Sequence, residues 1–375
     1  MRFIAVLSLG LSVGLSAMSS AVWADSAPQL RSQLAEEVSA VAADVISWRR
    51  DIHEHPELSN REFRTSKLVA DHLKSLGMEV QTGVAHTGVV GILRGGKPGP
   101  VLALRADMDG LPVVEKTGLA YASTQLGEYE GREVGVMHAC GHDVHITSLV
   151  GTAKLMAERQ DQWSGTLMLL GQPAEERIAG ARVMMEDGVW ERFGQPDFAM
   201  AFHVTSALPT GFLSAPETSA YSGADTVDIV IKGVGAHGAS PHTGIDPIVL
   251  GSQIVMGLQT VVSRSLAPRR PGVITVGSFH SGTKHNIISD EAKLQLTVRS
   301  ESPEDRQILL DGIKRVAINM GKVAGLPDDM LPQVRVNEGE AVPPTINDAA
   351  FTREIRGGWR EYFGADVFYQ GERMG

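Results

Sequence analysis

Short apolar runs alternate with helical segments through the first half of the chain, and this alternation is what most limits the possible fold. Apolar runs predict buried strands at residues 88–93, 101–105, 165–170 and 198–203. Helices are predicted at residues 30–52, 145–157 and 181–186. Strands that alternate with helices are typical of an α/β layer with a mixed, mostly parallel sheet.

One further helix is predicted from a local signal after His55-Pro56. Ser59 and, three residues later, Glu62 form the pattern of a capping box, in which each side chain accepts a backbone N–H of the other residue. We therefore expect a helix that opens here and runs through Leu73 to Gly77.

The second half of the chain has a different order of elements. From about Glu217 onward, strands and helices are expected in the order β-α-β-β-α-β, at residues 225–232, 247–264, 273–279, 292–299, 303–323 and 333–337. This is the order of the ferredoxin-like unit, which can fold as a domain of its own. A last helix is predicted at residues 351–363.

Composition excludes some classes of partner. The chain has 375 residues, enough for two domains, with 43% hydrophobic and 21% charged residues, as in soluble globular proteins. Its formal net charge is −10 and it has no basic block. We therefore expect neither a nucleic acid nor an anionic membrane surface as a partner.

The N-terminus predicts export. Arg2 precedes an apolar run over residues 3–22, followed by Val22-Trp23-Ala24, a small-x-small cleavage site. We interpret residues 1–24 as a signal peptide cut after Ala24, which implies a periplasmic or secreted protein without a membrane anchor. The alternative is a transmembrane anchor, but serine and glycine dilute the run.

The stretch MHACGHDVH, residues 137–145, concentrates residues that bind metals. It holds the only cysteine of the chain, Cys140, together with His138, His142 and His145. Thiolate and imidazole are the side chains that hold zinc. The alternative is a small buried cysteine among unrelated histidines.

Carboxylate or imidazole side chains also follow three of the predicted strands. Asp107 and Asp109 follow the strand at 101–105, the pair Glu175-Glu176 follows the strand at 165–170, and His203 ends the strand at 198–203. Ligands of open α/β sheets bind beyond the carboxyl ends of the strands. The adjacent carboxylates suit one metal ligand and one proton carrier, with a solvated acidic turn as the alternative.

Six stretches span most of the chain: RRDIHEHPELSNREFRTS (49–66), LALRADMDGLP (102–112), MHACGHDVH (137–145), GQPAEE (171–176), AFHV (201–204) and GAHGASPHTGIDPI (235–248). Together, and in this order, they resemble the amidohydrolase branch of the aminoacylase and carboxypeptidase family of di-metal exopeptidases. This branch includes hippurate hydrolases, N-acyl-amino-acid amidohydrolases and hydrolases of indole-acetyl amino acids.

The resemblance implies roles for individual residues. Two divalent metal ions, zinc first and manganese or cobalt as alternatives, would be held by Cys140, His142, Glu176 and His203. Glu175 would be the general base and His237 would polarise the scissile carbonyl, often across a dimer interface. Asp107 and Asp109 would orient these groups. Asn286 and Arg299 would hold the substrate carboxylate.

The resemblance also implies an activity and a domain plan. The activity would be hydrolysis of the amide bond of small N-acyl or N-aroyl amino acids by a metal-activated water. Residues 25–216 and 331–375 would form the catalytic domain, and residues 217–330 an inserted lid that makes a homodimer. Relatives continue beyond a Met-Gly like Met374-Gly375 to a further metal-ligand histidine. A truncated, inactive relative or an acyl-amino-acid binding protein is therefore the alternative.

One motif favours a different class of enzyme. Residues 233–238 match the dinucleotide fingerprint G-x-G-x-x-G and follow a predicted strand. A nicotinamide-dependent oxidoreductase would need this motif to open a helix, whereas Pro241 and Gly244 follow it.

Overall fold

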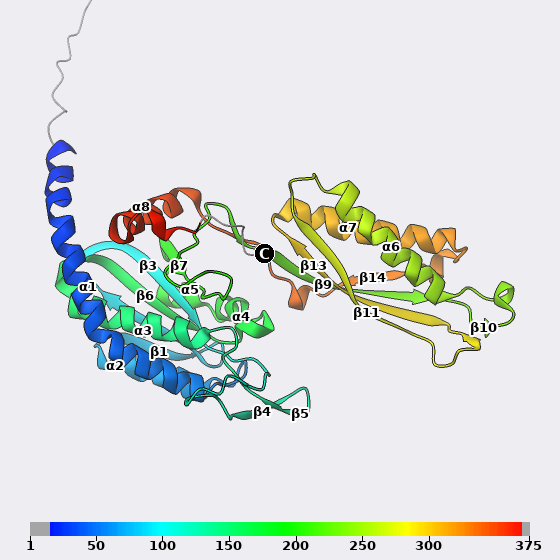
Figure 1. Cartoon of the computed structure of the whole chain (residues 1–375), viewed down its shortest axis with the longest axis horizontal. Coiled ribbons are helices and arrows are strands. Elements are labelled where there is room, and N and C mark those ends of the chain that lie inside the picture. The colour runs from blue at the N-terminus through cyan, green and yellow to red at the C-terminus, as the bar shows by residue number, and fades with distance from the viewer. Residues whose placement is uncertain (1–15, 370–375) are drawn as a thin grey trace, which may run out of the picture. The chain divides into compact units, whose positions relative to one another are not determined.

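The computed structural model describes residues 16–369, in two compact units (Figure 1). The first unit comprises the chain to Glu175 together with Val183–Val204, and the second comprises Glu176–Arg182 and the chain from Thr205. Most of the predicted signal peptide, residues 1–15, lies outside the described residues. Among the residues described, no helix is both long and apolar enough to cross a membrane.

The first unit is built on a five-stranded sheet in the order β1-β2-β6-β3-β7. These strands are β1 (Glu79–Val84), β2 (Gly88–Arg94), β3 (Lys97–Asp107), β6 (Ser164–Gln172) and β7 (Phe198–Ala201). β3 pairs in parallel with both β6 and β7, whereas β2 is antiparallel to its neighbours β1 and β6. Only β2 therefore runs against the others, which confirms a mixed, mostly parallel sheet.

Both faces of this sheet are covered. Successive residues of β6 point to opposite faces, so Leu167 and Leu169 join one core and Met168 and Leu170 the other. Three helices supply the first core, as Figure 1 shows: α1 (Ser16–Glu54), α2 (Phe63–Ser75) and α3 (His142–Glu158). The second core includes residues from α4 (Gly180–Glu186) and α5 (Val189–Phe193). A strand buried on both faces must be continuously apolar, as β2 and β6 are.

The second unit contains the predicted β-α-β-β-α-β order. Its elements are β9 (Gly223–Lys232), α6 (Pro247–Ser265), β11 (Gly272–Ser281), β13 (Glu291–Ser300), α7 (Pro303–Val323) and β14 (Gln333–Val336). The strands form an antiparallel sheet in the order β11-β13-β9-β14, the ferredoxin-like arrangement. Helix α8 (Ala349–Phe363) follows it in the same unit.

Within the described part of the chain, only one face of this second sheet is covered by helices. Along β9 and β13 alternate residues are buried, and they pack with the apolar faces of α6 and α7 in a single core. Asp246 and Ser302 cap the two helices by accepting backbone N–H groups.

The capping box predicted at Ser59 and Glu62 is wrong. Neither side chain caps α2; instead the two oxygens of Glu57 accept the N–H groups of Arg64 and Thr65, at 3.0 and 2.8 Å. The hydroxyl of Ser59 donates to Asp109 at 2.6 Å. Glu57 lies just far enough before the helix to reach its free N–H groups, which leaves Ser59 and Glu62 available for other contacts.

Two further differences are local. α3 begins at His142 rather than His145, because Gly141 adopts a left-handed conformation that starts the helix there. The hairpin of β4 (Leu126–Tyr129) and β5 (Arg132–Gly135) lacks an apolar pattern and was not predicted.

The dinucleotide fingerprint does not open a helix. Its last residues form β10 (Ala236–His237), which pairs with β12 (Ile287–Ile288), and a short 3₁₀ turn follows at Pro241–Thr243. α6 begins only at Pro247, so the motif offers no helix N-terminus to a pyrophosphate.

We expect Leu294→Ala to lower the free energy of unfolding of the second unit by about 2–5 kcal/mol, because it leaves a cavity in the core. Leu294 is fully buried, whereas the adjacent Lys293 on the same strand points outward. Lys293→Ala is the matched control and should change stability by less than about 0.5 kcal/mol. Urea denaturation followed by circular dichroism measures both; equal effects would contradict the described packing.

Candidate metal centre and active site

The carboxyl ends of three adjacent parallel strands form the floor of the candidate site. Asp107, the last residue of β3, is opposite Gln172 at the end of β6, and Arg105 is opposite Ala201 at the end of β7. The chain then leaves β6 toward Glu175 and leaves β7 toward His203. Parallel pairing thus brings together groups that are far apart in the sequence.

Cys140, His142 and His203 form one group that could hold a metal ion. Their ligand atoms all lie within 4.8 Å of one another, and the Cys140 Sγ–His203 Nε2 distance is 3.4 Å. The close approach needs a glycine between the first two residues: a Cβ on Gly141 would lie 2.4 Å from Cγ2 of Val204, and its φ is 82°.

The tautomers of both histidines suit metal binding. His142 donates from Nδ1 to the backbone carbonyl of Asp109 at 2.8 Å, and His203 donates from Nδ1 to the carbonyl of Val204 at 2.6 Å. With the proton on Nδ1, the lone pair of the neutral ring is on Nε2. A hydrogen bond from the distal ring nitrogen is the usual support of a metal-binding imidazole.

Cysteine binds metals as the thiolate, and the site favours that form. Hydrogen bonds with His142 and His203 lower the pKa of the Cys140 thiol to about 7, although burial opposes them. The donor set therefore fits a divalent metal such as zinc.

Asp107, His142 and His145 form a second, fully buried group with metal-binding spacing. His145 lies between Asp107 Oδ1, at 2.6 Å from its Nδ1, and the N–H of Val204, which donates to its Nε2 at 3.0 Å. Because Nε2 accepts, Nδ1 donates to Asp107. Arg105 donates to the other oxygen of Asp107 at 2.7 Å. Burial raises the pKa of Asp107, but His145 and the charges of Arg105 and His142 outweigh it and hold the pKa well below its usual range.

His145 was named in the histidine-rich stretch but was given no role among the predicted site residues, although its spacing from His142 offers a signal for one. It follows His142 by three positions at the start of α3, so the two rings share a face of the helix. Their ring centroids are 5.5 Å apart.

Asp109 makes hydrogen bonds with several parts of the site. It is buried; its Oδ2 accepts the hydroxyl of Ser59, its Oδ1 accepts the N–H of Glu175 at 3.1 Å, and its carbonyl accepts His142.

Glu175 lies at the edge of the site and is partly open to solvent. Its Oε2 is 3.8 Å from His142 Nε2, and its side chain is 39% exposed. Burial and the negative charge of Asp107 raise the pKa of Glu175. The adjacent Glu176 offers a carboxylate oxygen to a third group with His142 and Glu175.

The second unit holds the remaining predicted residues. His237 is exposed on β10, beside Asn286, whose carbonyl accepts the N–H of Gly238 at 2.9 Å. Arg299 is exposed near the far end of β13, about 27 Å along the strand from Glu291. Within this unit the structure brings His237 and Asn286 together but not Arg299.

A buried polar network behind α3 was not predicted. His53 contacts Asp143 through Nδ1 at 2.9 Å and Glu115 through Nε2 at 3.2 Å, and Arg49 donates to Asp143 at 2.6 Å. His138 is buried and belongs to none of the three possible metal groups found among the described residues; burial lowers its pKa to about 4.

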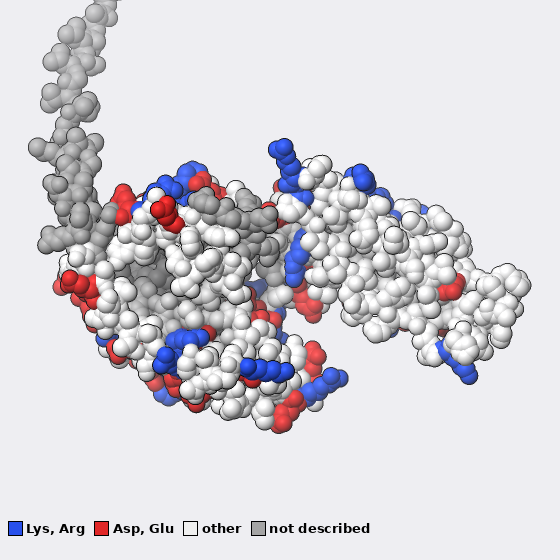
Figure 2. Space-filling model, viewed as in Figure 1, with Lys and Arg blue, Asp and Glu red and all other residues white. Residues whose placement is uncertain are grey.

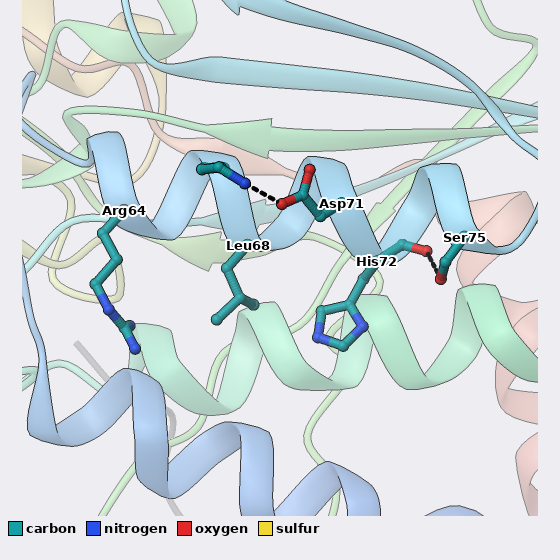
Figure 3. A pocket seen from close by; sticks show the side chains of 6 residues that line it. Arg64, Leu68, Asp71, His72 and Ser75 are labelled. Atoms are coloured by element: carbon teal, nitrogen blue, oxygen red, sulfur yellow. Dashed lines mark hydrogen bonds and ion pairs between the residues drawn. The ribbon is translucent and has the colours of Figure 1, made fainter.

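An open groove along α2 lies apart from these groups (Figure 3). It is lined by Arg64, Lys67, Leu68, Asp71, His72 and Ser75. Its charges are already paired, Lys67 with Asp71 and Arg64 with Asp51 of α1. We assign it no chemistry.

Comparison with known proteins identifies the family. The model of peptidase family M20/M25/M40 matches residues 103–375. Thermostable carboxypeptidase 1 of Saccharolobus solfataricus is 39% identical over 86% of this chain and 79% of its own length. N-acetyl-L-cysteine deacetylase of Bacillus subtilis is 36% identical over 85% of this chain and 73% of its own, and hippurate hydrolase of Campylobacter jejuni is 35% identical over 80% and 74%.

A solved structure supports the same assignment. A protein of Bacillus subtilis described as a dinuclear metal binding peptidase of the M20 family superposes with a TM-score of 0.74 at 32% identity, covering 90% of this chain and 83% of the other. The chain therefore belongs to peptidase family M20/M25/M40, as one of its metal-dependent amidohydrolases.

Proposed function

We propose that this protein hydrolyses the amide bond of small N-acyl or N-aroyl amino acids, yielding a carboxylic acid and a free amino acid. The observation that carries the proposal is the position of Glu175 beside the group Cys140, His142 and His203. Three relatives support the substrate class by their names: a hippurate hydrolase, an N-acetyl-L-cysteine deacetylase and an IAA-amino acid hydrolase of Arabidopsis thaliana.

Zinc is the metal we propose, in a two-metal centre held by Cys140, His142, Glu176 and His203. When bound, such ions lower the pKa of water and polarise the substrate carbonyl. Thiolate and imidazole favour zinc, and the carboxylates would also accept manganese or cobalt.

Glu175 is suited to move the proton. Burial and the charge of Asp107 raise the pKa of Glu175 toward neutral pH. A carboxyl group with such a pKa can both accept and donate a proton during the reaction. Glu175 takes one proton from the attacking water and gives it to the leaving amine, so that one water is consumed for each amide bond. Its partial exposure lets both water and substrate reach it.

His237 is proposed to polarise the scissile carbonyl. The N–H of Ala239 donates to its Nδ1 at 3.1 Å, so the ring proton is on Nε2, which can donate to a carbonyl oxygen. Asn286, its neighbour, and Arg299 are proposed to hold the substrate carboxylate, from the same chain or a second copy.

We expect Glu175→Gln to reduce kcat by about 10²- to 10⁴-fold while metal content stays unchanged, because only the proton carrier is lost. The assay is release of free amino acid from N-acetyl, N-benzoyl and N-indoleacetyl amino acids, with added zinc and after chelation. Glu191→Gln, the same change at an exposed glutamate of α5, is the matched control and should keep the wild-type rate.

Near-normal turnover by Glu175→Gln would remove Glu175 as the base. A folded, metal-loaded wild-type chain that releases no amino acid from any of these substrates would contradict the proposed activity. Binding of the same compounds without release would then identify an acyl-amino-acid binding protein.

We further propose a homodimer through the second unit. Three large apolar side chains are exposed along α6 and α7, Val249 at 54%, Met256 at 70% and Val323 at 78%, and they line or adjoin an open groove without charged residues. The face of the second unit seen in Figure 2 carries few charged side chains. Contiguous exposed apolar surface is typical of a protein interface.

Met256→Glu is expected to shift the mass in analytical ultracentrifugation from dimer toward monomer, because it places a charge in the proposed interface. Gln259→Glu adds the same charge to α6 outside the groove and should leave the mass unchanged. A wild-type monomer, or equal effects of the two variants, would contradict this interface.

A further inference from the structure

Glu62 is a buried carboxylate whose three contacts lie outside its own helix. Its side chain has no exposed surface. Oε1 accepts the N–H of Asn60 at 3.0 Å and the N–H of Ala174 at 2.9 Å, and Oε2 accepts the hydroxyl of Thr87 at 2.5 Å. A buried carboxylate is costly unless such donors satisfy it, so its position needs an explanation.

The contact with Ala174 gives that explanation, because Ala174 immediately precedes Glu175. Ala174 is fully buried and has a φ of 50°, in the left-handed region that alanine seldom adopts. Such a conformation persists only where the surroundings hold it. Glu62 provides the hydrogen bond that fixes the N–H of this residue.

A second carboxylate holds the next amide. Asp109 accepts the N–H of Glu175 itself at 3.1 Å and is in turn held by Ser59. Two consecutive N–H groups of the segment that carries the base are therefore bound by two buried acids, Glu62 and Asp109. Both come from elements other than the strand that delivers Glu175.

We propose that Glu62 is a positioning residue for Glu175: by accepting the N–H of Ala174, it holds the turn in the conformation that points the Glu175 carboxylate at the metal-binding histidine. The inference rests on the proposed role of Glu175 and extends it to a residue that touches neither metal nor substrate. Burial raises the pKa of Glu62. Oε1 can accept the N–H groups of Asn60 and Ala174 whether or not Oε2 carries a proton. The carbonyl oxygen of a glutamine at this position should therefore accept the same two N–H groups.

The test compares Glu62→Ala, Glu62→Gln and Val69→Ala in the full-length chain. Val69 is a buried residue of α2 that belongs to the first core and follows Glu62 by seven positions, so its variant is the control for loss of stability. Two readouts are measured: hydrogen exchange of the amides of residues 174 and 175 by mass spectrometry, and kcat with KM for an N-acyl amino acid.

Glu62→Ala is expected to speed exchange at these amides at least tenfold and to lower kcat by about 10- to 100-fold, with KM within about threefold of wild type. Glu62→Gln is expected to restore both readouts to within about threefold of wild type. Val69→Ala should lower the melting temperature and change neither readout. Should Glu62→Ala not fold, Glu62→Asp, whose shorter side chain cannot span to Ala174, takes its place with the same expectation.

Unchanged exchange and kcat in Glu62→Ala would overturn the proposal, and so would equal losses in Glu62→Ala and Val69→Ala or a failure of glutamine to restore them. The exchange readout does not need turnover. A wild-type chain without hydrolytic activity would therefore contradict the proposed function, while faster exchange in Glu62→Ala would still show that Glu62 holds the turn.

Discussion

The parallel pairing of β3 with β6 on one side and β7 on the other is the constraint on which the candidate site depends. Each strand ends at the same edge of the sheet and continues into a segment with a chemical group: Asp107, Glu175 and His203. Cys140 lies in the turn before α3, and His142 is the first residue of that helix. The residue between them is glycine because a Cβ at position 141 would lie 2.4 Å from Cγ2 of Val204. A shift of any one strand by one residue would turn its group to the other face.

Buried charge is concentrated around this edge and is organised by hydrogen bonds. Asp107 is shared by His145 and Arg105, and Asp109 by Ser59 and the backbone of Glu175. Each of these acids is thus satisfied by a donor from at least one other segment, which fixes the position of that segment. Backbone carbonyls of Asp109 and Val204 accept the Nδ1–H groups of His142 and His203, so the backbone leaves Nε2 of both rings to face a metal ion.

Local patterns predicted the elements well but not every role. β3 and β6 could be predicted as strands from their continuous apolar runs, and α6 and α7 as helices from the spacing of their apolar residues. Burial produces such patterns in the sequence. The hairpin β4–β5 has no such pattern. The capping box failed for a physical reason: Glu62 has a buried donor 112 residues away, at Ala174, and Glu57 is better placed for the helix. No local pattern can show a contact of that range.

The candidate metal-binding stretch could be found because the single cysteine stands among three histidines, whereas the contacts of His145 and Glu62 needed coordinates because their partners lie far away in the sequence. The most direct test of the account is a titration of the metal-free chain with cobalt, followed by metal analysis. Because Cys140 is the only cysteine, any thiolate-to-cobalt absorption band must come from it. The account predicts two bound ions per chain together with such a band. Fewer than one bound ion, or binding without the band, would contradict a metal centre that contains Cys140.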